Sequence, residues 1–327
     1  MGIAVEWAGI AYNVLIRGNA SMSERLRRYA PAIAVILCAI AAVAGLRPQA
    51  VPAALALLSQ WPPGEEQFPE KLKALRPEVN TPKDAPEFYF TRLVYTENGW
   101  RGRRTMPKPS PYTCPEFGGS NFFPRQGWGW ATDYPGGDCK FMGGVHRLTG
   151  VRVHPNPNVI AIMDPGLFKY PYVYAVEVGG MYLRDEEAAR LRDYLLRGGF
   201  LHVDDFWGGY QKENFEQQMK KVFPDRRMEP VPLSHAVFHT FYDLDAVMQV
   251  PNRGNACYGE RTWEQPDDTE PVIYGIADDT GRLMVMVTYN SDLGDAWEYM
   301  DWPCYPEKYS GYAYRVGIDF MIYSMTH

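Results

Sequence analysis

Two pairs of side chains in this sequence have the types and the spacing of a metal site. Asp204 and Asp205 directly follow the apolar run 200–203, so they lie where a buried strand would end. His235 and His239 are four residues apart, a spacing that puts both imidazoles on one face of a helix. Carboxylates and imidazoles bind Zn²⁺ or another divalent ion, which can activate water. A divalent metal is therefore the one cofactor that these residues indicate, and otherwise we expect none.

A neighbouring acidic turn supports this interpretation, and a structural alternative opposes it. Asp292 and Asp295 lie in the turn-like segment 290–295 and could add carboxylate ligands. In the alternative, the two strand-end aspartates cap the next helix or accept hydrogen bonds from loop amides. The two histidines would then belong to a turn and to the edge of the core.

Apolar runs and amphipathic segments alternate along most of the chain and would position these residues. We expect strands at 88–95, 159–163, 172–178, 200–203, 272–276 and 283–288, and helices at 138–149, 186–197, 213–222 and 312–325. The run 159–163 is continuously apolar, as in a strand buried on both faces. Alternation at this spacing predicts an α/β domain with a doubly wound, mostly parallel sheet. Such sheets bind ligands beyond the carboxyl ends of their strands, where the two aspartates are expected.

A long stretch, residues 96–137, contains many glycines, prolines and aromatic residues and has no regular period. Loops of this length inside a domain are usually functional or contact surfaces. Aromatic residues there either pack onto the core or contact a partner. The residues expected to contact a partner protein are Trp128, Trp130, Tyr134, Arg101, Arg103 and Arg104.

Four of the five cysteines could form disulfides in an exported domain. We expect Cys114 to pair with Cys139 and Cys257 with Cys304, and free buried thiols are the alternative. No Cys-x-x-Cys-His haem motif or pair of Cys-x-x-Cys zinc motifs is present. No Gly-x-Gly-x-x-Gly follows a strand, which argues against a dinucleotide site.

The N-terminal region has the sequence features of a membrane-targeting segment. Arginines precede an apolar run at 30–46, so the N-terminus should stay in the cytoplasm. We expect a cytoplasmic segment with an interfacial helix (1–28), a transmembrane anchor or signal segment (29–47), a proline-rich linker (48–87) and the α/β domain (88–327). The chain would cross the inner membrane once, with its domain in the periplasm. Cleavage near residue 44 or 50 would instead secrete the domain.

Several long motifs resemble one uncharacterised bacterial domain family whose members are often exported or membrane-anchored. That family is itself similar to class I glutamine amidotransferases and trehalose-utilisation-like proteins. The resemblance covers about residues 88–327 and implies a flavodoxin-like three-layer sandwich. The matching segments are 88–93, 193–208, 222–227, 235–239, 241–244, 278–285, 290–298 and 313–319.

The expected function follows from what is missing at the strand end. An amidotransferase needs a Cys on a strained turn between a strand and a helix, with a His and a Glu. No Cys follows the run 200–203, and Asp204 and Asp205 stand there instead. We therefore expect a non-catalytic accessory or scaffold subunit that contacts membrane protein subunits, for example of a respiratory or photosynthetic complex.

Two further expectations concern partners and chemistry. The chain would contact lipid through residues 29–47, and its formal net charge of -6 argues against a nucleic-acid partner. The alternative function is a metal- or carboxylate-dependent hydrolase or sugar-related enzyme, with Asp204, Asp205 and His235 as catalytic candidates and His239 as a further metal ligand.

Overall fold

The computed structural model describes residues 86–97, 114–117 and 129–327. The expected cytoplasmic segment, the expected anchor and nearly all of the expected linker lie outside these residues. Of the helices that are described, none combines the length and the apolar character needed to cross a bilayer.

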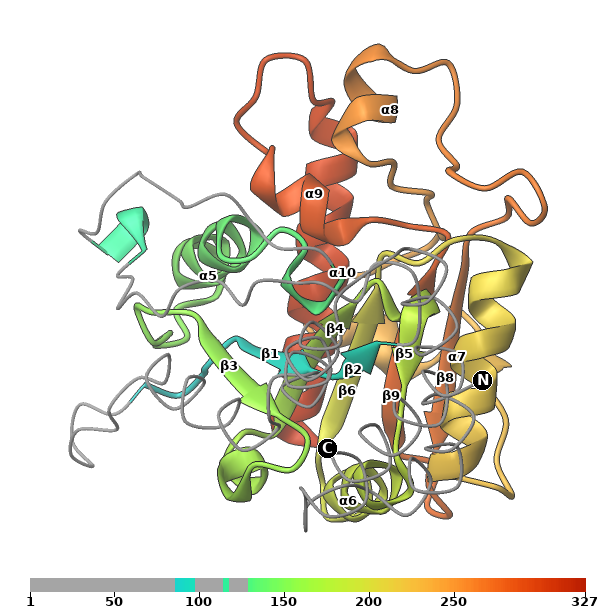
Figure 1. Ribbon diagram of the computed structural model, residues 1–327. Coiled ribbons are helices and arrows are strands. Elements are labelled where there is room, and N and C mark those ends of the chain that lie inside the picture. Colours follow the sequence, from blue (N-terminus) through green and yellow to red (C-terminus); the bar gives the residue numbers. More distant parts are fainter. Residues whose placement is uncertain (1–85, 98–113, 118–128) are drawn as a thin grey trace, which may run out of the picture. The chain divides into compact units, whose positions relative to one another are not determined.

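Seven strands in the described part form one mixed, mostly parallel sheet (Figure 1). β1 pairs in parallel with β3 on one side and with β4 on the other, and β4, β6 and β9 follow in parallel. β8 is antiparallel to β9, and β7 is antiparallel to β8. In spatial order the strands are β3 (Asn158–Ala161), β1 (Thr91–Val94), β4 (Tyr172–Val176), β6 (Phe200–Asp204), β9 (Leu283–Tyr289), β8 (Val272–Ala277) and β7 (Glu229–Pro230).

Helices cover both faces of this sheet (Figure 1). On one face, Phe90 contacts Phe141 of α5, Tyr174 contacts Trp297 of α9, and His202 contacts Phe320 of α10. α6 and α7 pack against each other over the other face. The helices are α5 (Gly136–Thr149), α6 (Asp185–Leu196), α7 (Gly208–Val222), α8 (Arg253–Tyr258), α9 (Leu293–Glu298) and α10 (Glu307–Thr326).

Short elements complete the described part. β2 (Thr96–Glu97) and β5 (Met181–Tyr182) form a separate antiparallel pair. The 3₁₀ helices are η1 (Pro115–Phe117), η2 (Gly129–Ala131), η3 (Pro165–Lys169), η4 (Val178–Gly180) and η5 (Ala236–His239).

The order of the strands creates a reversal point beside β1. The chain goes from β1 through α5 to β3 on one side, then returns to β4 on the other side of β1. Open α/β sheets bind ligands beyond the carboxyl ends of strands near such a point. The carboxyl ends of β1 and β4, which flank this point, are therefore where a site is expected, and the carboxyl ends of β6 and β9 follow along the same edge.

The α/β class and the mostly parallel sheet predicted from the sequence are confirmed, with shifted boundaries. α7 begins at Gly208, five residues earlier than the helix expected at 213–222. The first two amides of α7 donate hydrogen bonds to side-chain oxygens: Gly208 N–H donates to Asn290 Oδ1, and Gly209 N–H donates to Asp267 Oδ2. Because these amides have partners, the helix starts at two glycines that a propensity argument would leave in a loop.

Candidate acidic site at the carboxyl edge of the sheet

The turns at the carboxyl edge hold their backbone in an uncommon conformation. Glu177, Asp205 and Asn290 directly follow β4, β6 and β9, and their φ angles are 56°, 52° and 53°. The remaining non-glycine residue with positive φ in the described part is Asp133, at 61°. Left-handed backbone at a non-glycine residue costs free energy, and such residues concentrate at functional sites. The backbone therefore singles out this edge.

Asp204, one of the predicted site residues, is saturated by hydrogen bonds. Its Oδ2 accepts from Tyr174 Oη at 2.7 Å and from the amides of Leu293 and Gly294 at 2.8 and 3.2 Å. Its Oδ1 accepts from Thr288 Oγ1 at 2.5 Å. Burial raises the pKa of Asp204 to about 6, against the lowering effect of these donors. Asp204 thus joins β4, β6, β9 and the start of α9, as the structural alternative expected.

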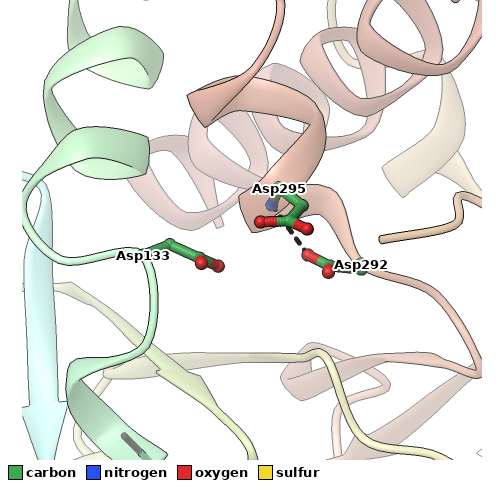
Figure 2. Close-up of side chains that lie close together, drawn as sticks. All are labelled: Asp133, Asp292 and Asp295. Atoms are coloured by element: carbon green, nitrogen blue, oxygen red, sulfur yellow. Dashed lines mark hydrogen bonds between the residues drawn. The ribbon is translucent and has the colours of Figure 1, made fainter. Parts of the chain in front are cut away.

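Other carboxylates gather beside Asp204 and form what we call the acidic cluster: Asp133, Asp205, Glu264, Asp292 and Asp295. Oxygen atoms of Asp133, Asp292 and Asp295 all lie within 4.8 Å of one another (Figure 2). A second group with the same spacing consists of Asp205, Glu264 and Asp292. Asp292 belongs to both groups, so the cluster is continuous.

The acidic cluster is buried, and this governs its protonation. Asp133 and Asp292 are 4% and 3% exposed, while Asp295 is partly exposed. Burial is the largest cause that raises the pKa of all three carboxyls, and the neighbouring carboxylates raise it further for Asp133 and Asp292. Without a cation, the cluster therefore resists full ionisation at neutral pH.

This protonation predicts how stability depends on pH. A carboxyl whose folded pKa lies above its unfolded value of about 3.9 binds more protons in the folded state, so stability falls as pH rises through that interval. With a chelator present, we expect the free energy of unfolding to decrease as the pH rises above the unfolded value of about 3.9 towards neutral pH. Urea denaturation across this range measures it. Asp133→Asn should flatten the slope, and an unchanged slope would contradict the assignment.

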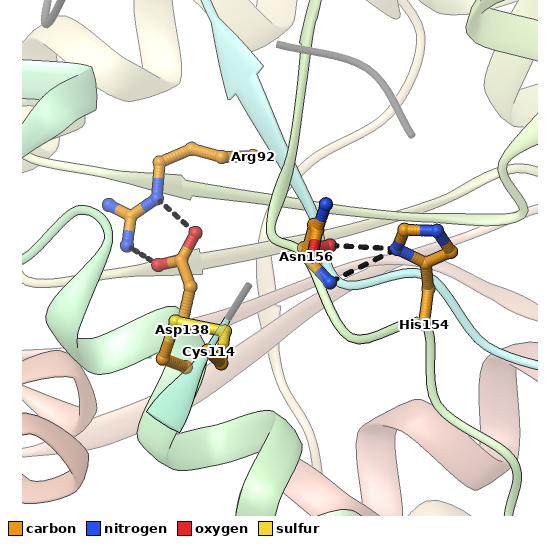
Figure 3. The surroundings of a disulfide bond; sticks show 6 residues. Arg92, Cys114, Asp138, His154 and Asn156 are labelled. Carbon is orange, nitrogen blue, oxygen red and sulfur yellow. Dashed lines mark hydrogen bonds and ion pairs between the residues drawn. A yellow bond between two sulfur atoms is a disulfide. The ribbon is translucent and has the colours of Figure 1, made fainter. Parts of the chain in front are cut away.

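Asp133 is positioned by a buried arginine. Arg92 Nη1 donates to the carbonyl oxygens of Trp130 and Thr132, at 3.3 and 2.6 Å, just before Asp133 in the chain. Its Nε and Nη2 donate to the two carboxylate oxygens of Asp138, at the start of α5 (Figure 3). Arg92 is 1% exposed and therefore forms a fully buried ion pair with Asp138. This ion pair fixes the loop that carries Asp133.

The turn between β9 and α9 positions the other two carboxylates. Asp292 Oδ1 accepts from the backbone amide of Asp295 at 2.7 Å (Figure 2). Asp295 Oδ2 accepts from the amide of Arg253 at 2.6 Å, which ties the turn to α8. Asp292 N–H in turn donates to the carbonyl of Val250. Both carboxylates therefore have fixed orientations that do not depend on a ligand.

The structure does not bring the two histidines to the two strand-end aspartates. His235 lies 6.1 Å from the ring of Tyr323, whose hydroxyl accepts from the amide of Leu283 at the start of β9. Asp204 and Asp205 lie beyond the opposite ends of the strands, and a seven-residue strand such as β9 spans about 20 Å.

Each histidine also has its own local role. His235 precedes η5, and its Nδ1 accepts from the amide of Val237, so the stretch is a single 3₁₀ turn. His239 Nδ1 and Nε2 contact Asp243 and the carbonyl of Leu233. The carboxyl groups that the structure brings together at the carboxyl edge of the sheet therefore include neither histidine.

The aromatic residues predicted as partner contacts are packing residues where the structure describes them. Trp130 and Tyr134 are 5% and 2% exposed, and the ring of Tyr134 lies beside the Arg92 guanidinium. They fill the space over the carboxyl end of β1, so they are not available to a partner. Trp128, Arg101, Arg103 and Arg104 lie outside the described residues.

Two disulfides join the four cysteines of the described part. Cys114 is bonded to Cys139 of α5, next to Asp138 (Figure 3). Cys257 of α8 is bonded to Cys304 in the segment before α10. The second bond links α8, which precedes β8, to the segment between α9 and α10, so it joins two segments that lie beside the acidic site.

Asp133 and Glu264 are site residues that the sequence analysis missed. Both lie in stretches without regular period, far in sequence from the strand-end aspartates. The available signal for Asp133 was local: it directly precedes Tyr134-Pro135-Gly136-Gly137, where a turn enters a helix. For Glu264 no such signal exists.

Comparison with known proteins gives a family without a described activity. No curated protein matches the chain. Residues 124–325 match the family described as a domain of unknown function (DUF4159), a span that covers more than half of the 327 residues and includes every member of the acidic cluster. The chain therefore belongs to the DUF4159 family.

Proposed function

We propose that this chain is an exported, membrane-anchored accessory subunit whose domain binds a partner at the carboxyl edge of its sheet. When the five parallel strands are numbered along the chain, their spatial order in the sheet is 2-1-3-4-5, which is the order of flavodoxin-like folds. On an amidotransferase-like scaffold of this kind, the turn after β6 would hold the nucleophile. Here that turn holds Asp205, whose Oδ1 accepts from Trp207 Nε1 at 2.9 Å.

One observation carries the binding role: the rim above this edge displays aromatic and arginine side chains on segments fixed by a disulfide. Tyr258, next to Cys257, is 80% exposed, and Trp302 near Cys304 is 42% exposed. The Arg253 guanidinium lies 5.1 Å from the centre of the Trp302 ring. Tyr, Trp and Arg on a preordered surface are the residues that contribute most to protein interfaces.

The rim can be tested with one substitution and a matched control. We expect Tyr258→Ala to weaken association with the membrane complex at least tenfold, about 1.4 kcal/mol, without a change in melting temperature. Tyr210→Ala is the control, because Tyr210 is 79% exposed on α7, outside the disulfide-linked rim. Affinity capture from detergent extracts measures both. Equal effects of the two substitutions would contradict the assignment of the rim.

Export and anchoring have a chemical test of their own. The disulfides support an oxidising compartment. We expect thiol alkylation of the denatured, unreduced chain to label Cys38, the fifth cysteine, which lies in the expected anchor, and none of the four disulfide-bonded cysteines. Mass analysis after gentle detergent extraction should show an uncleaved chain migrating with other membrane subunits. A chain that begins near residue 45 or 51 and migrates alone would overturn the anchored role.

A metal-dependent hydrolase is the second candidate, and the acidic cluster is the observation that favours it. Carboxylates that hold a divalent ion can activate water for attack on an ester. The two proposals differ in their response to Asp205→Asn. An accessory subunit should keep its partner after this change, whereas loss of a metal-dependent hydrolytic rate would favour the enzyme.

A further inference from the structure

We propose that Asp133, Asp292 and Asp295 bind one hard divalent cation, Ca²⁺ or Mg²⁺, at the carboxyl edge of the sheet. This inference rests on the proposed function only in placing a ligand at the same edge. It holds equally if the cation is structural or if it bridges the domain to an acidic group of a partner.

An unpartnered buried oxygen points to the ligand. No N–H group or hydroxyl donates to Asp133 Oδ2, although Asp133 is 4% exposed, and the side-chain neighbour of this carboxyl is the carboxyl of Asp295. Figure 2 shows its carboxylate directed toward Asp292 and Asp295, which come from the other side of the site. A buried carboxylate oxygen without a donor is costly, and a bound cation removes that cost.

The backbone around this oxygen is shaped to leave room for it. A Cβ atom on Gly294 would lie 2.3 Å from Asp133 Oδ2, closer than real Cβ atoms approach. A Cβ on Gly137 would lie 3.2 Å from the carbonyl oxygen of Gly294. The two glycines allow the starts of α5 and α9 to approach and bring the three carboxylates together.

Neighbouring cations do not neutralise the three carboxylates. Arg92 is directed to Asp138 and to two carbonyl oxygens, and it affects Asp133 only through space. The guanidinium of Arg253 lowers the pKa of Asp295 through space, but it lies over the ring of Tyr299, 4.8 Å from its centre, and it is the backbone amide of Arg253 that donates to Asp295. The surrounding carboxylates of Asp205, Glu264 and Glu298 add further negative charge.

The donor set selects the type of metal. All three ligands offer carboxylate oxygen, and no histidine or cysteine belongs to the group found among the described residues. Hard cations such as Ca²⁺ and Mg²⁺ prefer oxygen donors, whereas Zn²⁺ sites use nitrogen and sulfur. Ligand oxygens on opposite sides of Ca²⁺ are about 4.8 Å apart, so three oxygens that lie within 4.8 Å of one another can share one ion. Asp295 is partly exposed and gives the ion a route from solvent.

The test uses the full chain in detergent after treatment with a chelator. Adding Ca²⁺ or Mg²⁺ at about 100 times its Kd should raise the melting temperature by about 5–10 °C, with one ion bound per chain. Asp133→Asn keeps the shape of the side chain and tolerates the positive φ, so the variant should fold. It should lose this response and melt no lower than the chelated wild-type chain, because a neutral amide has replaced a carboxyl that is costly to bury in its ionised form.

Controls separate this result from general effects of charge. Asp225→Asn changes an exposed aspartate far from the cluster and should respond to cations as wild type does. Asp295→Asn is the second variant, since an amide oxygen can still accept from Arg253, and it too should lose the response.

A wild-type chain that shows no cation response, or an Asp133→Asn variant that responds fully, would overturn the site. A proton shared between Asp133 and Asp295 would then explain the buried pair. A chain that binds the cation but has no membrane partner would instead contradict only the accessory role.

Discussion

Replacing Arg92 by methionine is expected to lower the free energy of unfolding by about 3–5 kcal/mol, because it leaves Asp138 as a buried charge without its partner. The same change removes the donors to the carbonyl oxygens of Trp130 and Thr132. Those carbonyls hold the loop that carries Asp133, so the variant should also lose its response to Ca²⁺ or Mg²⁺. Urea denaturation with and without the cation measures both effects.

A double substitution distinguishes loss of the ion pair from loss of packing. Asp138→Leu alone should also destabilise the domain, since the buried guanidinium then lacks its counter-charge. The pair Arg92→Met with Asp138→Leu should cost less than the sum of the two single changes, because neither buried charge remains. The hydrogen bonds between Arg92 and Asp138 predict that the two residues act together. If the costs of the two single changes add up to the cost of the double change, this prediction is wrong.

Much of the sheet was predictable from the sequence because its strands are apolar runs, and segments with the hydrophobic period of a helix separate most of them. The antiparallel direction of β8 was also readable, since only residues 278–282 separate β8 from β9. A parallel connection needs a dozen or more residues, whereas a hairpin can turn within five. Gly281, with a φ of 89°, provides the left-handed residue of that turn.

The site was predictable only in part, for a physical reason. A strand-end position follows from local sequence, so Asp204 and Asp205 could be placed at the carboxyl edge. The position of Asp133 depends on the long-range ion pair of Arg92 with Asp138, which no local pattern reveals. The i, i+4 spacing of His235 and His239 misled because it assumed a helix, whereas the chain makes one 3₁₀ turn at the other end of the sheet.

Replacing Asp204 by alanine should be similarly severe, at about 3–5 kcal/mol, because four donors lose a charged acceptor within the core. The hydroxyl groups of Tyr174 and Thr288 lose their carboxylate acceptor, and so do the amides of Leu293 and Gly294. Asp204→Asn keeps one acceptor oxygen and should cost about half as much. Thermal and urea denaturation of the two variants measure the difference, and equal costs would show that the hydrogen bonds to the oxygen retained in the asparagine contribute nothing.

This prediction also separates structural from ligand-binding carboxylates, although they lie side by side. Leu293 and Gly294 begin α9, which carries Asp295, so Asp204→Ala should reduce stability and the cation response together. Asp133→Asn should remove the cation response and leave stability intact or improved. If both variants lose stability to the same degree, then Asp133 serves the fold as Asp204 does and the cation site is wrong. If they diverge, the edge contains one aspartate that holds the strands together and another that is kept for a ligand.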